Sequence, residues 1–201
     1  MNKQGLRFLF TAVAFATGLV TLLACSGTSA NSASATSIPV DAASRAILTI
    51  EDLPDAWRKG EVTTKTISGA VRLAVGFLGA RDPSMGWINV GQEIYVYPSQ
   101  ESATAAYGQQ IDAYFPVRGD DGWQPAPELE FTSRANQMTI ACLPVRINGE
   151  PVTTCKAVAQ YRNMIEVVGS NLYKDQWMTV EGFRKVLAAM DRRAVAVLSG
   201  Q

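Results

Sequence analysis

Histidine is absent from this chain of 201 residues, and its absence excludes much of enzyme chemistry. Neither a Ser-His-Asp nor a Cys-His arrangement can be assembled, and the most common nitrogen ligand for zinc, copper or iron is missing. A phosphate-binding loop is missing too, because the run from Gly76 to Gly79 has neither the spacing nor the Lys-Ser/Thr ending that such loops need. The sequence therefore predicts no cofactor and no metal site.

An excess of positive charge is also lacking. Lys and Arg together number 18, and so do Asp and Glu. Without Lys3 and Arg7 the balance becomes 16 against 18, a net charge of −2. The nearest approach to a basic run is Arg192-Arg193, which lies in a helical pattern and is typical of a solvated helix face. A nucleic-acid partner is not expected.

The uncharged run near the start of the chain is short for a membrane span. The uncharged residues 8–24 follow Lys3 and Arg7 and are diluted by threonine and glycine. A transmembrane helix needs about 20 mostly apolar residues. A basic start followed by a short apolar run is typical of a secretory signal peptide.

The apolar run ends in Leu22-Leu23-Ala24-Cys25, which resembles the lipobox of bacterial lipoproteins. That resemblance implies that residues 1–24 are a cleaved signal peptide and that Cys25 carries a diacylglycerol as the first mature residue. A transmembrane helix and a plain signal peptide are the alternatives, but neither explains the small Ala24 directly before the cysteine. The expected location is the cell envelope, on the outer face of the cytoplasmic membrane or, as Ser26 implies in two-membrane bacteria, at the outer membrane.

Residues 25–38 are rich in Ser, Ala and Thr. Such small residues bury too little apolar surface to offset the entropy of ordering, so this segment is predicted to be a flexible tether. Residues 39–201 are long enough for one globular domain with its own core.

The two remaining cysteines are placed by a hairpin. Asn148-Gly149 is a strong signal for a two-residue type I′ turn. Counting outward from that turn puts Cys142 opposite Cys155 in a non-hydrogen-bonded pair, where Cα atoms are about 4.5 Å apart and a disulfide fits. Two reduced buried thiols are the alternative, although export to an oxidising compartment favours the disulfide.

The other elements follow from periodicity and caps. Strands are expected at residues 62–67, 88–97, 128–131 and 164–168, while residues 71–78 are ambiguous between strand and helix. Helices are expected at residues 41–48, from the Ser99 cap to Phe115, and after the Thr179 cap. Antiparallel strands interrupted by a few helices predict an α+β fold, an antiparallel sheet with helices packed on one face.

A second resemblance concerns this domain. The stretch Leu48-Thr49-x-x-Asp52-Leu53-Pro54-x-x-Trp57, followed by strands, a capped helix, a cysteine-paired hairpin and a closing helix, is similar to small extracytoplasmic sensor or lipoprotein domains of bacteria. The layout resembles the PsbP/Mog1-like fold.

The leading functional hypothesis is a non-catalytic module that binds an envelope protein, a glycan or a lipid. Trp87, Tyr95, Tyr97 and Trp123 are the candidate lining of its ligand groove, because Tyr95 and Tyr97 project opposite to the apolar face of their strand. The alternative is that these aromatic side chains fill the core.

Two further hypotheses stay open. One is an enzyme that works with a carboxylate pair, as in glycoside hydrolysis. Its candidate acids are Glu93, Asp120, Asp121, Glu128 and Glu130. The other is a structural subunit that bridges a larger membrane complex.

Overall fold

The computed structural model describes residues 37–54, 57–82, 86–147, 149–173 and 178–200; for residues 80–82 and 86–88 it describes the backbone alone. Residues 35–201 form one compact unit. Cys25 lies outside the described residues. Ile38, which the sequence assigns to the tether, is 1% exposed and packs in the core. Its backbone N–H donates to Asn163 Oδ1 at 2.7 Å, so the folded body includes Ile38.

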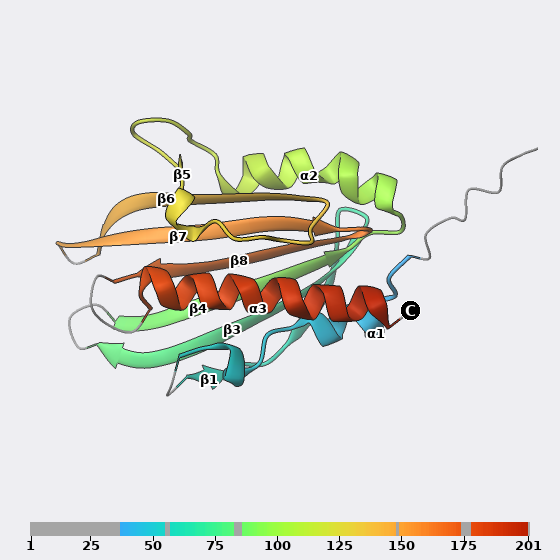
Figure 1. Ribbon diagram of the computed structural model, residues 1–201, viewed down its shortest axis with the longest axis horizontal. Coiled ribbons are helices and arrows are strands. Elements are labelled where there is room, and N and C mark those ends of the chain that lie inside the picture. Colours follow the sequence, from blue (N-terminus) through green and yellow to red (C-terminus); the bar gives the residue numbers. More distant parts are fainter. Residues whose placement is uncertain (1–36, 55–56, 83–85, 148, 174–177, 201) are drawn as a thin grey trace, which may run out of the picture. The chain divides into compact units, whose positions relative to one another are not determined.

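The described strands form one antiparallel sheet in the order β1-β3-β4-β8-β7-β6-β5, and β2 also pairs with β3 (Figure 1). The strands are β1 (Arg58–Lys59), β2 (Thr63–Ile67), β3 (Ala70–Asp82), β4 (Gly86–Val96), β5 (Gln124–Pro125), β6 (Gln137–Ile147), β7 (Glu150–Tyr161) and β8 (Met164–Leu172). The helices are α1 (Val40–Ala43), α2 (Gln100–Tyr114) and α3 (Val180–Ser199), with 3-10 turns η1 (Ser44–Ala46), η2 (Ile50–Asp52) and η3 (Pro127–Leu129).

The β6-β7 hairpin has the register that the sequence predicts, with Ile147 opposite Glu150 and Cys142 opposite Cys155. The two cysteines form a disulfide, and their Cα atoms are 4.1 Å apart. Gly149 adopts a φ of +89°, as the tight turn requires, while Asn148 lies outside the described residues. The predicted disulfide is confirmed.

Helices cover both faces of the sheet, with α1 and α3 on one face and α2 on the other (Figure 1). Successive residues of β8 alternate between the two hydrophobic clusters, since Met164 and Val168 pack on the α3 side whereas Ile165 and Val167 pack on the α2 side. This differs from the expectation that the helices pack on one face. Central strands that are apolar on both faces need a cover on each side.

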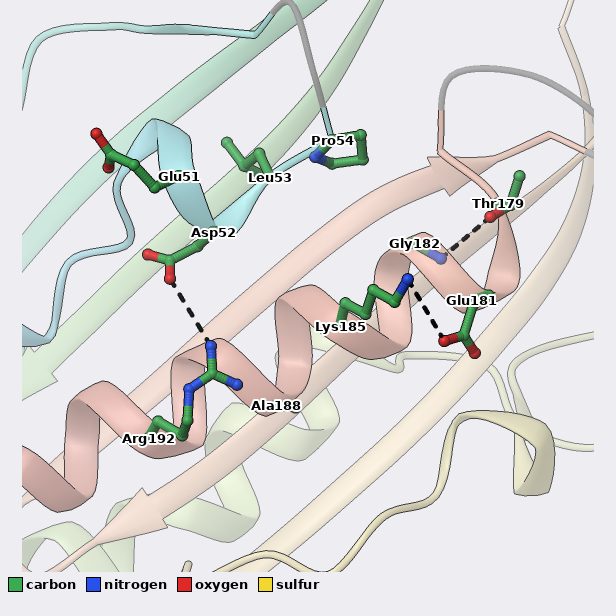
Figure 2. A pocket seen from close by; sticks show the side chains of 10 residues that line it. All are labelled: Glu51, Asp52, Leu53, Pro54, Thr179, Glu181, Gly182, Lys185, Ala188 and Arg192. Atoms are coloured by element: carbon green, nitrogen blue, oxygen red, sulfur yellow. Dashed lines mark hydrogen bonds and ion pairs between the residues drawn. The ribbon is translucent and has the colours of Figure 1, made fainter.

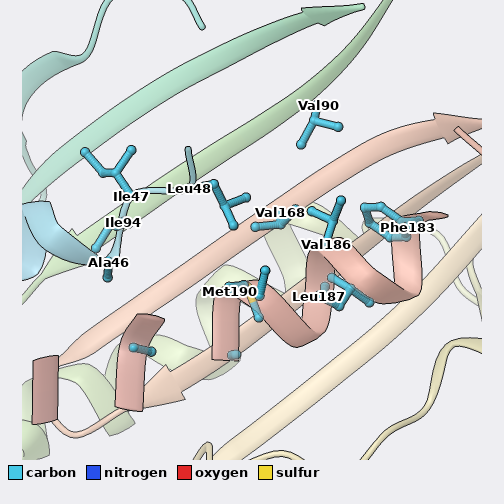
Figure 3. Packing of buried hydrophobic residues seen from close by; sticks show 14 of the residues in the cluster. Ala46, Ile47, Leu48, Val90, Ile94, Val168, Phe183, Val186, Leu187 and Met190 are labelled. Carbon is cyan, nitrogen blue, oxygen red and sulfur yellow. The ribbon is translucent and has the colours of Figure 1, made fainter. Parts of the chain in front are cut away.

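The cluster beneath α3 is the larger one. Phe183, Val186, Leu187 and Met190 recur at helical spacing along α3, and each is fully buried (Figure 3). They face Val90, Ile94 and Val168 of the sheet and the segment Ala46–Leu48 that follows α1 (Figure 3). Each such side chain contributes about 1.5–3 kcal/mol by leaving water, so this face supplies most of the apolar stabilisation.

Both long helices begin where the sequence predicts. Ser99 Oγ accepts a hydrogen bond from the Ser102 backbone N–H at 3.2 Å, and Thr179 Oγ1 accepts one from the Gly182 N–H at 3.0 Å. These caps satisfy backbone donors that a helix leaves free in its first turn.

The prediction of a strand at residues 128–131 is wrong. Pro127 instead begins the 3-10 turn η3, and Gln124–Pro125 form the short strand β5. Proline fits the first position of a helical turn because it has no N–H to leave unpaired. The ambiguous residues 71–78 belong to strand β3, and the first helix ends in a 3-10 turn at Ala46.

One acidic side chain is enclosed within the α3 side of the core. Glu166 is 0% exposed, and its Oε2 accepts a hydrogen bond from Gln92 Nε2 at 3.2 Å. Among the described residues Glu166 Oε1 has no hydrogen-bond partner. Burial raises the pKa of Glu166 to about 8, and the nearby Asp191 acts in the same direction. Glu166 therefore holds its proton at neutral pH.

Candidate functional site

A groove of about 370 Å³ lies on the α2 side of the sheet, where β3, β4, β8 and β7 run side by side and the last turn of α2 ends. We call it the glycine groove. It is lined by Gly76, Leu78, Asn89, Val90, Gly91, Glu93, Tyr114, Thr154, Lys156, Val167, Gly169, Ser170 and Asn171.

Three glycines form the floor of the glycine groove. Gly76 of β3 pairs directly with Gly91 of β4, and Gly91 pairs with Gly169 of β8. A Cβ atom added at Gly76 or Gly91 would meet no atom within 4 Å. The space above these two residues is therefore open, and packing within the described chain does not require glycine at either position.

Glycine inside a strand weakens the strand, and it commonly marks a bulge or a place where a ligand or another backbone approaches closely. Gly76 and Gly91 lie in regular pairing, since the irregularity between β3 and β4 falls between Leu78 and Arg81. A bulge therefore does not explain these two glycines, and the space above them is open to a ligand or to another backbone. At Gly169 the chain supplies a further reason, because an added Cβ would lie 3.0 Å from Lys156 Cγ.

Glu93 forms the wall of the groove on the side of α2. Its Oε2 accepts hydrogen bonds from Arg72 Nε at 2.6 Å, from the Tyr95 hydroxyl at 2.6 Å and from the Tyr114 hydroxyl at 2.7 Å. Burial by itself would raise the pKa of Glu93, but the hydrogen bonds from Arg72, Tyr95 and Tyr114 outweigh it and lower that pKa to about 2. Glu93 is therefore an anion at neutral pH, and Arg72 neutralises it.

Lys156 of β7 brings a second positive charge to the groove. Its ammonium lies 4.8 Å from the centre of the Trp123 ring and 5.4 Å from the centre of the Tyr114 ring. Such contacts with aromatic faces hold a cation in place. Partial burial lowers the pKa of Lys156, and the charge of Glu93 opposes that effect.

The wall opposite Glu93 carries polar side chains. Asn89 is paired with Leu78, and Asn171 is paired with Thr154, at the positions two residues beyond the glycine row. The Thr154 hydroxyl donates to Asn171 Oδ1 at 2.7 Å. The Ser170 hydroxyl donates to the Asn89 backbone carbonyl at 2.9 Å and fixes the edge of the groove.

The aromatic residues predicted to line a groove belong mainly to the hydrophobic cluster on the α2 side of the sheet. Tyr95, Tyr97 and Trp123 are each 8% exposed or less. Tyr95 and Tyr97 do project opposite to Ile94, but α2 covers them. They are buried in the cluster on the α2 side instead of facing solvent, which agrees with the alternative that they fill the core. The side chain of Trp87 lies outside the described part of the structure.

Sequence reasoning did not find the glycine row or Lys156. Three glycines at distant positions give no local pattern, and only the β3-β4-β8 pairing places them side by side. Of the predicted acids, Glu93 lies in the groove and is the one carboxylate among its described lining residues. Asp120, Asp121, Glu128 and Glu130 are exposed and lie elsewhere. The carboxylate pair of a glycosidase is therefore not assembled around the groove.

The described residues contain no group of three or more Cys, Asp or Glu side chains placed to hold a metal ion. None of the helices in the described ranges combines the length and apolar composition of a membrane span.

A second hollow of about 520 Å³ lies between η2 and α3, from the Thr179 cap to Arg192 (Figure 2). Charged side chains dominate it: Asp52 and Arg192 approach to 4.0 Å, and Lys185 and Glu181 to 3.8 Å. The Lys185 and Arg192 side chains are 74% and 68% exposed, so their ion pairs are screened by water and specify little. Asp52 is 11% exposed but is already held by Thr49 and Arg193. The glycine groove is the better candidate because its cation Lys156 is also partly buried and lies against aromatic rings.

No protein-family model and no curated protein matches this sequence. The fold is similar to the crystal structure of the extracellular domain of PknH from Mycobacterium tuberculosis. The two share 10% sequence identity with a TM-score of 0.60, and the match covers 83% of this chain and 100% of that chain. At this identity the likeness establishes the fold alone.

Proposed function

We propose that this chain is a lipid-anchored, extracytoplasmic binding module of the bacterial cell envelope, which holds a ligand in the glycine groove without transforming it. The observation that carries the proposal is the row of Gly76, Gly91 and Gly169, because it keeps a regular part of the sheet open at a cost in strand stability.

Three features support a location outside the cytoplasm. The Cys142–Cys155 disulfide is of a kind that persists in oxidising compartments. The first 25 residues resemble a lipoprotein signal that ends at Cys25. The fold is shared with a domain described as extracellular in PknH. None of these features depends on the groove.

Binding without catalysis agrees with the state of Glu93. A general acid must hold a proton near neutral pH, whereas the pKa of Glu93 is lowered to about 2. Its three hydrogen-bond donors also fix it in place, and no second carboxylate lies among the described residues that line the groove. This arrangement suits a fixed recognition element.

Anchoring is tested by mass spectrometry of the protein purified from its native host. We expect an amino terminus at Cys25 that carries a diacylglycerol, and we expect Cys25→Ala to abolish both cleavage and lipid attachment. An unprocessed wild-type amino terminus without lipid would show that the anchor does not exist.

Ligand binding is tested with variants that fill the groove. Gly91→Val adds a branched side chain where an added Cβ meets no atom within 4 Å, so folding should survive. Gly108→Ala on α2 is the matched control, because its added Cβ also meets nothing and Gly108 lies outside the groove. The probes are the glycan fraction and the lipid extract of the native envelope, offered separately and detected by native mass spectrometry.

We expect the wild type and Gly108→Ala to retain a component of unchanged mass, and Gly91→Val to lose it. Equal retention by Gly91→Val would exclude the glycine groove as the binding site. A bound component that changes in mass during incubation would instead favour the hypothesis of an enzyme.

A further inference from the structure

The glycine groove combines a flat floor, a polar wall and a fixed cation, and each of these features limits what can bind there. The inference below rests on the proposed function and specifies the chemical class of the ligand.

The floor is wide enough for a ring. Gly76 and Gly169 are separated by two strand spacings, so the floor extends about 10 Å across the sheet. On each strand the next residues on the same face are two positions away, which leaves about 7 Å from the glycine row to each wall. One face of a six-membered ring can therefore lie against backbone along this row, where any larger residue would raise the floor.

The wall beyond the row favours a ligand rich in hydroxyl groups. Asn89 and Asn171 each offer both donors and an acceptor in one side chain. Thr154 donates to Asn171 Oδ1, which occupies that oxygen and leaves the amide N–H groups of Asn171 for other acceptors. A hydroxyl group is likewise both donor and acceptor, so neighbouring hydroxyls on a sugar ring match such a wall. An acyl chain would leave these groups without partners, at a cost.

The charges in the groove favour an anion. Glu93 and Arg72 neutralise each other at 2.6 Å, so Lys156 is the excess charge. Within the described part of the chain none of the ion pairs involves Lys156. Lys156 is partly buried beside two aromatic rings, and the nearby Glu93 is already paired with Arg72. A bound negative group therefore stabilises the ammonium, because that group replaces lost hydration.

We propose that the glycine groove binds an acidic saccharide, with the sugar ring on the Gly76-Gly91-Gly169 floor and its carboxylate at the Lys156 ammonium. The hydroxyl groups of the ring bond to Asn89 and Asn171. The rings of Tyr114 and Trp123 position Lys156. Tyr114 is itself held by the hydrogen bond that its hydroxyl donates to Glu93.

The test uses two probes that differ in one group, oligosaccharides of glucuronic acid and the matched oligosaccharides of glucose. Titration calorimetry with the detergent-purified full-length chain measures their dissociation constants. Lys156→Met keeps an unbranched side chain of similar length and removes its charge, whereas Lys156→Arg keeps the charge. Lys65→Met, at an exposed lysine of β2 outside the groove, is the control.

We expect Lys156→Met to weaken binding of the acidic probe at least tenfold and to leave the neutral probe unchanged. Lys156→Arg should largely restore acidic binding, and Lys65→Met should have no effect. A higher salt concentration should weaken binding of the acidic probe more than binding of the neutral probe, because only the acidic probe has a charge–charge interaction with Lys156. Gly91→Val should abolish the binding of both probes.

Two results would overturn the inference while leaving the proposed function intact. In one, Gly91→Val abolishes binding of the acidic probe but Lys156→Met does not weaken it. In the other, neither saccharide binds, and a lipid or peptide binds in a manner that Gly91→Val abolishes. If no component of any class binds in a manner sensitive to Gly91→Val, both the inference and the proposed function fail. Thermal melting of each variant shows whether a loss of binding reflects unfolding.

Discussion

Replacing Glu166 by glutamine should remove a large pH dependence from the stability of this protein. Glu166 is fully buried, and its pKa is raised from 4.5 to about 8 in the folded state by burial first and then by Asp191, against a hydrogen bond from Gln92. In the unfolded chain the carboxyl returns to its ordinary pKa. The two states therefore bind different numbers of protons between these two values.

The sign of the effect follows from that difference. Between pH 4.5 and about 8 the folded protein holds the proton and the unfolded chain has lost it, so the free energy of unfolding falls as pH rises. Below this window both states are protonated, and above it both are ionised. At about 1.4 kcal/mol for each pH unit, the whole window corresponds to a loss on the order of 5 kcal/mol.

Few other groups in this chain titrate in the same pH range. It contains no histidine, so no side chain with an ordinary pKa changes its charge between pH 5 and 8. Urea denaturation followed by tryptophan fluorescence, at intervals of one pH unit from 5 to 9, gives the free energy of unfolding. The wild type should lose roughly 4 kcal/mol between pH 5 and 8.

Glu166→Gln keeps the shape of the side chain and removes the titrating proton. Its free energy of unfolding should be nearly constant over this range and should exceed that of the wild type at pH 9. Glu150→Gln, at an exposed position of β7, should follow the wild-type curve. If the pH dependence of the wild type persists in Glu166→Gln, the reasoning about burial and protonation is refuted.

Two further predictions concern the cross-link and the last helix. Replacing both Cys142 and Cys155 by alanine removes a bond across a sequence separation of 13, and should lower the free energy of unfolding in urea by about 3 kcal/mol. A loss below about 1 kcal/mol would contradict the chain-entropy account. Thr179→Ala removes the acceptor for the Gly182 N–H and should cost about 1 kcal/mol by the same assay, whereas Thr179→Ser should retain most of the stability. Equal losses in the two variants would show that the hydroxyl is not what stabilises the helix.

The β6-β7 hairpin shows how far local sequence determines this fold. A two-residue turn fixes which residues face each other, and the two cysteines then pair without information from the rest of the chain. The starts of α2 and α3 are local as well, because Ser99 and Thr179 cap backbone groups only three residues away.

The wrong strand at residues 128–131 and the placement of α2 show the limit of local signals. A short stretch before the hairpin carries too few residues to separate a strand from the 3-10 turn that Pro127 begins. Nothing near Gln100–Tyr114 specifies which face of a sheet the helix will cover. That choice depends on the strand order, in which β8 lies between β4 and β7 and needs cover on both faces.

The sequence by itself determined the absence of histidine chemistry, the hairpin register, the disulfide and the capped helices, because each depends on composition or on residues close together in the chain. Only the tertiary structure decided that three glycines form one floor, that Glu93 and Lys156 border the same groove and that Glu166 is sealed from water. These features join residues from β3, β4, β7 and β8. Such pairings follow from long-range packing of the whole sheet, which no short segment of the chain encodes.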